Sequence, residues 1–329
     1  MSYTYNPKLR TIKPDWQGTP VDRKDRFTNI EFPFTPKTVD VLKWMLSRNP
    51  QKEEKKQDDF RLRHSNETSF LSHDKDCIVW LGHASFFLRV NGVDMLIDPV
   101  FYKVPFVRRY SDHAFSPETF TSLRYLLISH DHQDHCQEKS IRHIINKNPS
   151  VEILTGLKME SLLRRWSKEN TIQTAGWYQQ YITDPSIEIF FLPSRHWSKR
   201  GIWDDNMRLW GAFVVRSATK TIYFCGDSGY GGHFAEVKSL FKKVDVAIMG
   251  IGAYKPEWFM HPNHISPDDA VRAFNDMDAD ILIPMHYGTF DVSYEPVGEP
   301  LRKITQLEKE NGINGKLIPL QPGEAFIDF

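Results

Sequence analysis

The chain of 329 residues has few cysteines and no excess of either charge. Its three cysteines, Cys77, Cys136 and Cys225, follow no zinc-binding spacing and cannot all pair with one another. A reducing, cytoplasmic location is the expectation that follows. Lys and Arg together number 42, as do Asp and Glu. Because nucleic-acid-binding faces need an excess of basic residues, we expect no nucleic-acid partner.

Long hydrophobic runs are also absent from the sequence. The longest apolar runs have the length of a β-strand, whereas a helix needs about 20 apolar residues to cross a bilayer. Residues 1–7 contain no apolar core, so we expect no signal peptide. Any contact with a membrane is therefore expected to be peripheral, through an apolar surface of the N-terminal residues.

What the sequence does contain is a dense group of metal-ligand residue types. The motif HxHxDH at residues 130–135 brings three imidazoles and a carboxylate together, at His130, His132, Asp134 and His135. Nitrogen and oxygen donors of this kind suit a borderline cation such as zinc, with iron and manganese as alternatives.

The position of this motif favours a site at the end of a core strand. Residues 125–129 form an apolar run typical of a buried strand, and residues 137–146 place their apolar positions on one stripe of a helix. The carboxyl ends of such strands are where α/β folds place their sites. In an extended segment the two histidines of HxH face the same way, whereas the final Asp-His pair lies past the turn. The motif therefore predicts ligands for two divalent metal ions.

Three further candidate ligands each follow an apolar run downstream, and they are His196, Asp227 and His286. The runs that precede them occupy residues 187–192, 221–225 and 281–284. A single polar residue at a strand end is usually only a solvated side chain. Three such placements beside a dense cluster indicate one shared site.

These motifs resemble those of the metallo-β-lactamase fold hydrolases. A more specific resemblance is to the N-acylphosphatidylethanolamine-hydrolysing phospholipases D and their bacterial relatives, and it covers most of the chain. The segments that carry it are residues 16–20, 26–29, 80–84, 98–101, 193–197, 251–260, 264–271 and 286–290. The stretch from residue 251 to residue 290 is far more specific than HxHxDH alone.

The resemblance implies a role for each candidate residue. His130, His132 and His196 would bind a first metal ion. Asp134, His135 and His286 would bind a second, and Asp227 would bridge the two. His264 matches a histidine that lies near the reacting phosphate in the family. The relatives also make a homodimer the expected assembly.

The order of predicted elements indicates an α/β fold. Strands at residues 77–81, 85–90 and 93–97 form hairpins, with a turn signal at residues 91–92. Strands and helices alternate after them, which fits a four-layer αββα sandwich of two mixed β-sheets flanked by helices. Residues 1–74 show weak periodicity and are expected to be an N-terminal extension packed on a catalytic domain of residues 75–329.

Two neighbouring divalent ions share a water molecule and lower its pKa, which produces a hydroxide nucleophile for a phosphodiester. Asp134 and Asp227 would hold that hydroxide, and His264 would bind the phosphate or protonate the leaving oxygen. Aromatic and apolar residues crowd the predicted site loops, among them Trp197 and Tyr254 as substrate-binding candidates. They favour a lipid phosphodiester over a small soluble substrate, although ordinary loop packing explains them equally well.

Two alternatives remain open at this point. A lactonase or sugar-phosphate ester hydrolase would use the same metal centre. A metal-binding module without turnover is the alternative from another class. The sequence disfavours it, because a structural zinc site is closed and usually rich in cysteine.

Overall fold

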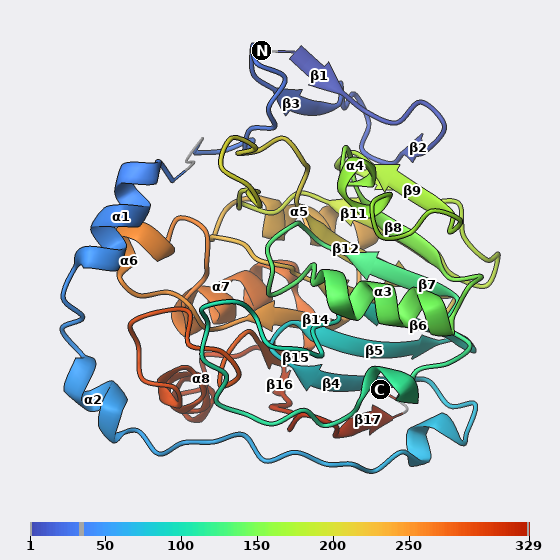
Figure 1. Ribbon diagram of the computed structural model, residues 1–329. Helices are drawn as coiled ribbons and strands as arrows, with labels where there is room; N and C mark the ends of the chain where they lie inside the picture. The colour runs from blue at the N-terminus through green and yellow to red at the C-terminus, as the bar shows by residue number, and fades with distance from the viewer. Residues whose placement is uncertain (1, 33–35, 328) are drawn as a thin grey trace.

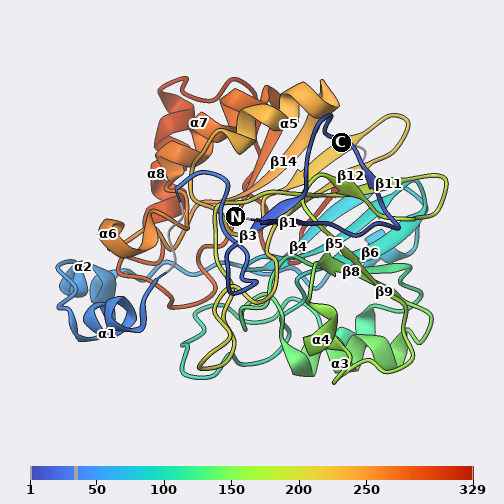
Figure 2. The same cartoon turned by 90° about the horizontal axis from the view of Figure 1, so that it is seen from above.

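The computed structural model describes residues 2–32, 36–327 and 329, and it has two β-sheets packed face to face (Figures 1 and 2). One sheet has eight strands in the order β16 (Lys316–Leu317), β15 (Ala279–Met285), β14 (Val244–Gly250), β13 (Thr221–Phe224), β12 (Ala212–Arg216), β11 (Glu188–Leu192), β10 (Gln179–Gln180) and β2 (Arg10–Thr11). The other has seven, in the order β17 (Ala325–Ile327), β4 (Cys77–Gly82), β5 (Ser85–Val90), β6 (Val93–Ile97), β7 (Tyr125–Ile128), β8 (Glu152–Gly156) and β9 (Ile172–Ala175). Both sheets mix parallel and antiparallel pairs.

Helices cover the outer face of each sheet. The eight-stranded sheet is covered by α5 (His233–Phe241), α7 (Pro267–Met277) and α8 (Glu299–Lys309), and the seven-stranded sheet by α3 (Glu138–Lys147) and α4 (Glu160–Leu163) (Figure 2). Helix α7 begins after Ser266, because Ser266 and Asp269 form a reciprocal capping box. The predicted four-layer αββα sandwich is confirmed.

The central strands of the seven-stranded sheet, β4 to β8, are buried on both faces, which explains their apolar runs. Along β4, Ile78 and Trp80 point into the core between the two sheets. Val79 points instead into a second core, which includes Ile141 and Ile144 of α3. Successive side chains of a strand face opposite ways, so each face contributes to a different layer boundary.

The N-terminal residues wrap around the outside of this sandwich (Figure 1). They contain β1 (Ser2–Thr4) paired with β3 (Thr19–Val21), then β2 at the edge of the large sheet, then α1 (Thr38–Leu46) and α2 (Lys52–Gln57). Helix α1 lies beside α6 (Glu257–Met260), where the rings of Trp44 and Phe259 stack with centroids 5.3 Å apart. No helix among the described residues is long and apolar enough to span a membrane.

Candidate metal centre

The structure brings the predicted ligands together at one end of the two sheets. The HxHxDH residues occupy the loop between β7 and α3. His196 follows β11, Asp227 follows β13 and His286 follows β15. Gly226 makes the turn before Asp227 possible, because its φ is +59° and a Cβ there would lie 2.7 Å from the carbonyl oxygen of Gly211.

The first group of side chains consists of His130, His132, His196 and Asp227, whose ligand atoms all lie within 4.8 Å of one another. His196 Nε2 is 3.2 Å from His132 Nδ1. The Nε2 atoms of His130 and His196 are each 3.8 Å from the same carboxylate oxygen of Asp227. Three imidazoles and one carboxylate that converge in this way can hold one cation.

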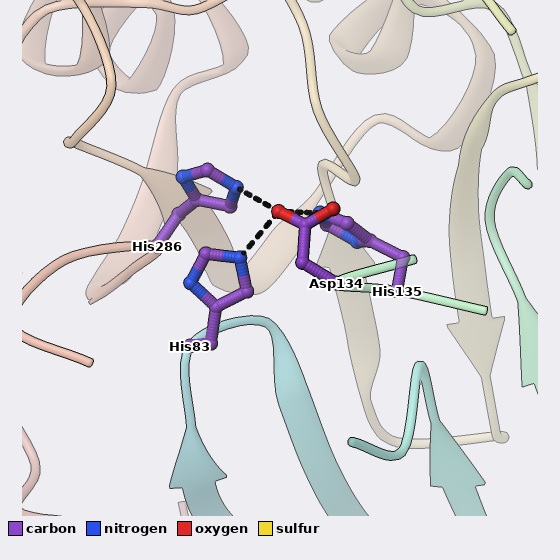
Figure 3. A group of neighbouring side chains, drawn as sticks. All are labelled: His83, Asp134, His135 and His286. Carbon is purple, nitrogen blue, oxygen red and sulfur yellow. Dashed lines mark hydrogen bonds and ion pairs between the residues drawn. The ribbon is translucent and has the colours of Figure 1, made fainter. Parts of the chain in front are cut away.

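The second group consists of Asp134, His135, His286 and a residue to which the sequence analysis gave no role, His83 (Figure 3). Asp134 Oδ2 lies 3.8 Å from His286 Nε2 and 3.9 Å from His135 Nε2. It lies only 2.9 Å from His83 Nε2.

Asp227 lies between the two groups. Its Oδ2 is 3.2 Å from His135 Nε2, and its Oδ1 is 3.3 Å from His286 Nε2. The same carboxylate therefore faces His130 and His196 on one side and two residues of the second group on the other. This is the placement that a bridging ligand requires.

Hydrogen bonds fix which ring nitrogen of several histidines is free. His135 Nδ1 donates to Asp98 at 2.8 Å, and His196 Nδ1 donates to the carbonyl oxygen of Asn263 at 3.1 Å. His130 Nδ1 donates to Ser129 Oγ at 2.9 Å, and that hydroxyl in turn donates to Asp98. In each ring the opposite nitrogen, Nε2, keeps its lone pair and points into the centre.

The buried nitrogens of the centre fit a metal ion. Nε2 of His130, His135 and His286 is buried and has no hydrogen-bond partner among the described residues. His132 instead turns Nδ1 toward the first group, 3.2 Å from His196 Nε2. A buried polar atom without a partner costs free energy. A cation is the partner that several converging lone pairs share, and the donor set of nitrogen and oxygen suits zinc, iron or manganese.

Electrostatics favour the metal-binding protonation states of His130 and Asp227 but not that of His135. Burial alone would lower the pKa of His135, but Asp227 and Asp98 raise it well above its usual value. Burial, together with the neighbouring histidines, lowers the pKa of His130 well below its usual value, so the ring is neutral. Burial alone would raise the pKa of Asp227, but His135, His286 and His264 hold it well below its usual value. Burial also lowers the pKa of His264 to about 4, although Asp227 opposes this.

The predicted substrate residues lie in different places. His264 Nδ1 is 3.8 Å from Asp227, and both His264 and Trp197 line a cavity above the two groups. Tyr254 does not line this cavity, since it is only 2 % exposed and its hydroxyl donates to Glu299. Tyr254 belongs to the resembling segment at residues 251–260, but that resemblance carried no information about the direction of its ring.

The cavity has a volume of about 550 Å³ and opens over a polar floor. Five candidate site residues form the floor: His132, Asp134, Asp227, His264 and His286. The rest of the lining is mostly apolar. It includes Pro36, Val41 and Trp44 from the N-terminal residues, Val104, Pro105 and Val107 from the loop after β6, Phe259 and Met260 from α6, and also Trp197, Ala253 and Val292. Gln133, Lys199 and Asn263 are its polar members.

Asp98 and His83 are buried polar residues of the centre for which the sequence predicted no role. Asp98 directly follows β6 and contacts both Ser129 and His135. His83 lies in the hairpin turn between β4 and β5. Both belong to segments that carry the family resemblance, which is the only sequence signal that could have indicated them.

The fold and this centre define a metal-dependent hydrolase of the metallo-β-lactamase fold. The family model described as the beta-lactamase superfamily domain matches residues 94–287, and the chain belongs to this family. The N-acyl-phosphatidylethanolamine-hydrolyzing phospholipase D 1 of Caenorhabditis elegans is 29 % identical over 319 residues, which cover 90 % of this chain and 88 % of that protein. A UPF0173 metal-dependent hydrolase of Hyperthermus butylicus is 27 % identical, over 75 % of this chain and 97 % of its own.

Solved structures show the same fold at lower identity. Igni18, a metallo hydrolase from Ignicoccus hospitalis, matches with a TM-score of 0.60 and 20 % identity, covering 78 % of this chain and 99 % of its own. An isothiocyanate hydrolase from Delia radicum gut bacteria matches with a TM-score of 0.62 and 16 % identity, covering 76 % and 98 %. At these identities the likeness establishes the fold alone.

Proposed function

We propose that the chain is a phosphodiesterase of the phospholipase D type, which cleaves N-acylphosphatidylethanolamine-like lipids with a binuclear metal centre. The observation that carries the proposal is the cavity itself. Its floor is a double cluster of histidines and carboxylates joined through Asp227, and its walls are mostly apolar. A polar reacting centre beneath apolar walls suits a substrate with a phosphodiester head and acyl chains. The relative from Caenorhabditis elegans, which is named for this activity, supports the same choice.

The residues that would hold the ions follow from the two groups. His130, His132 and His196 would hold the first ion, and Asp134, His135 and His286 the second, with Asp227 shared between them. Two divalent ions at such a site supply activation of a water molecule and neutralisation of phosphoryl charge, and zinc suits the donors best.

The chain's own side chains supply the remaining steps. Asp134 and Asp227 accept hydrogen bonds from the attacking water and so fix its direction toward phosphorus. His264, in the cavity floor beside Asp227, has a neutral ring and donates a hydrogen bond to the phosphate. Trp197 packs its ring 4.8 Å from that of His132 and shields the first group from bulk water.

Exposed apolar side chains support peripheral contact with a lipid surface. Phe106 is fully exposed, in the same loop as the cavity residues Pro105 and Val107. Leu46 is 85 % exposed at the end of α1, the helix that supplies Trp44 to the cavity wall. Exposed apolar patches of this kind commonly mark interaction sites, here at the edge of the cavity that would receive the lipid. A homodimer stays a prediction.

The test combines metal content with substrate preference. We expect two metal ions per chain by elemental analysis. We also expect chelator-sensitive cleavage of N-acylphosphatidylethanolamine in mixed micelles, faster than cleavage of soluble bis(p-nitrophenyl) phosphate or of a lactone. Preference for the lactone, or for the soluble diester, would contradict the lipid assignment. His264→Ala should lower turnover and retain both ions, and loss of metal from this variant would refute the role given to His264.

A further inference from the structure

We infer that His83 is a positioning residue of the metal centre, which orients Asp134 through a hydrogen bond and does not itself bind the ion. The inference rests on the second metal group of the proposed function. His83 is only 1 % exposed, and its Nε2 lies 2.9 Å from Asp134 Oδ2. Figure 3 shows the His83 ring approaching the same carboxylate oxygen that faces His135 and His286.

The backbone of His83 is held in place from several sides. Its N–H donates to Thr289 Oγ1 at 2.8 Å, and its carbonyl oxygen accepts the indole N–H of Trp80 at 2.9 Å. The same carbonyl accepts the backbone N–H of His286 at 3.0 Å. The hairpin turn between β4 and β5 is therefore connected to two residues of the second group, to Asp134 by a side chain and to His286 by the backbone.

The contacts of the His83 ring favour a positioning residue over a ligand. Nδ1 is buried and has no hydrogen-bond partner in the described part of the chain. His286 Nδ1 likewise has no partner among the described residues, so this atom does not separate the two roles. The contact distances do, because His83 Nε2 lies 2.9 Å from Asp134 Oδ2, whereas Nε2 of His286 and of His135 lies 3.8 and 3.9 Å from that oxygen. With the hydrogen on Nε2, the ring donates to a carboxylate and no donor is left unsatisfied. In His130, His135 and His196 the arrangement is the reverse, because Nδ1 has a protein acceptor and Nε2 faces the centre.

Asp134 needs such a partner more than Asp227 does. The Asp134 side chain is 19 % exposed toward the cavity, whereas that of Asp227 is 3 % exposed and faces candidate ligands on both sides. A carboxylate at the edge of a cavity can rotate toward solvent, and a hydrogen bond from a fixed ring restricts that rotation. Partners of this kind typically change metal affinity by about 10- to 100-fold when they are removed.

The experiment compares two amides at one position. His83→Asn tolerates the positive φ of +53° at this residue, but its amide is too short to reach Asp134. His83→Gln places an amide N–H near the position of Nε2. We expect His83→Asn to weaken binding of the second ion by about 10- to 100-fold in competition with a chelator, and His83→Gln to recover most of that loss. His143→Asn is the matched control. It removes another histidine–carboxylate pair, between His143 of α3 and Glu118, and should leave metal affinity unchanged.

A second readout uses the metal-free protein and does not depend on activity. Melting temperatures are compared for His83→Asn, Asp134→Ala and the double variant, all without metal. The double variant should lose less than the sum of the two single losses, because both substitutions remove the same hydrogen bond. Strictly additive losses would overturn the inference. Equal loss of the second ion in both His83 variants would make His83 a ligand instead. Binding of a single ion by the wild-type chain would contradict the proposed function. The melting temperatures of the metal-free variants would still show whether His83 and Asp134 interact.

Discussion

Asp98 is the residue whose replacement tests the metal centre most sharply. It is fully buried and accepts three hydrogen bonds, at 2.8 Å from the backbone N–H of Ser129, at 2.5 Å from Ser129 Oγ and at 2.8 Å from His135 Nδ1. Asp98→Asn keeps the shape and tolerates the positive φ of +43° at this position. It replaces one acceptor oxygen with an N–H₂ donor.

The expected magnitude follows from that single replacement. If the remaining oxygen keeps the bond from the Ser129 backbone, the new N–H₂ takes the place of Oδ2, which accepts from both Ser129 Oγ and His135 Nδ1. The Ser129 hydroxyl can turn and accept from the N–H₂, but the N–H of His135 then meets a second donor. His135 can then accept at Nδ1 only by moving its hydrogen to Nε2, the nitrogen that faces Asp227. Loss of one hydrogen bond to a buried charge costs about 1.5–3 kcal/mol of unfolding free energy. Metal affinity should fall by about 10- to 100-fold, because His135 no longer offers a lone pair.

Two measurements and one control separate these effects. Chemical denaturation of the metal-free protein gives the stability change, and competition with a chelator gives the affinity. Asp94→Asn is the control on the same strand, since it breaks the ion pair with Arg89, 2.6 Å long, away from the centre. It should lose stability and keep metal affinity. If Asp98→Asn bound metal as tightly as the wild type, or if Asp94→Asn lost the same affinity, the tautomer argument would be wrong.

Three more predictions concern the surroundings of the centre. Trp44→Ala removes a cavity wall that stacks on Phe259, so kcat/KM for N-acylphosphatidylethanolamine should fall about tenfold in steady-state assays, a loss of about 1.4 kcal/mol. Arg208→Met leaves the buried carboxylate of Asp131 without its 2.7 Å partner, and denaturation should show a loss of about 3 kcal/mol. Burial alone would raise the pKa of Glu299, but hydrogen bonds from Lys255, Tyr254 and Gln51 lower that pKa below its usual value of 4.5. The ionised Glu299 therefore stabilises the fold above pH 4.5, and this stabilisation is lost as the pH falls through the folded-state pKa. Glu299→Gln should therefore flatten the decline of melting temperature in that acid range, and an unchanged slope would refute this.

The strand ends were predictable from the sequence, because each ligand lies within a few residues of the end of a short apolar run. His196, Asp227 and His286 gather with the HxHxDH loop for that reason alone: strands of two packed sheets end at a common edge. The αββα layers were predictable from the hairpins at the beginning and the alternation after them. The helix at residues 267–277 could also be anticipated from its capping signals.

The residues that support the ligands were not predictable in the same way. A lone histidine in a hairpin turn has no pattern of its own, so His83 could be connected to Asp134 only through the three-dimensional structure. Asp98 supports His135 from another strand, 37 positions earlier in the chain. The direction of Tyr254 depended on a contact with Glu299, which is 45 residues away and invisible in local sequence.

The N-terminal residues show why composition alone could not describe the cavity. Their weak periodicity predicts only an extension, yet Pro36, Val41 and Trp44 form part of the cavity wall. Helix α2 fixes them there, because Lys55 pairs with Asp291, in the segment that follows His286. The N-terminal residues and the segment after the last candidate ligand thus stabilise each other. Since apolar walls strengthen the electrostatic interactions of a charged floor by excluding water, the N-terminal residues contribute to the chemistry of a centre whose candidate ligands all lie elsewhere.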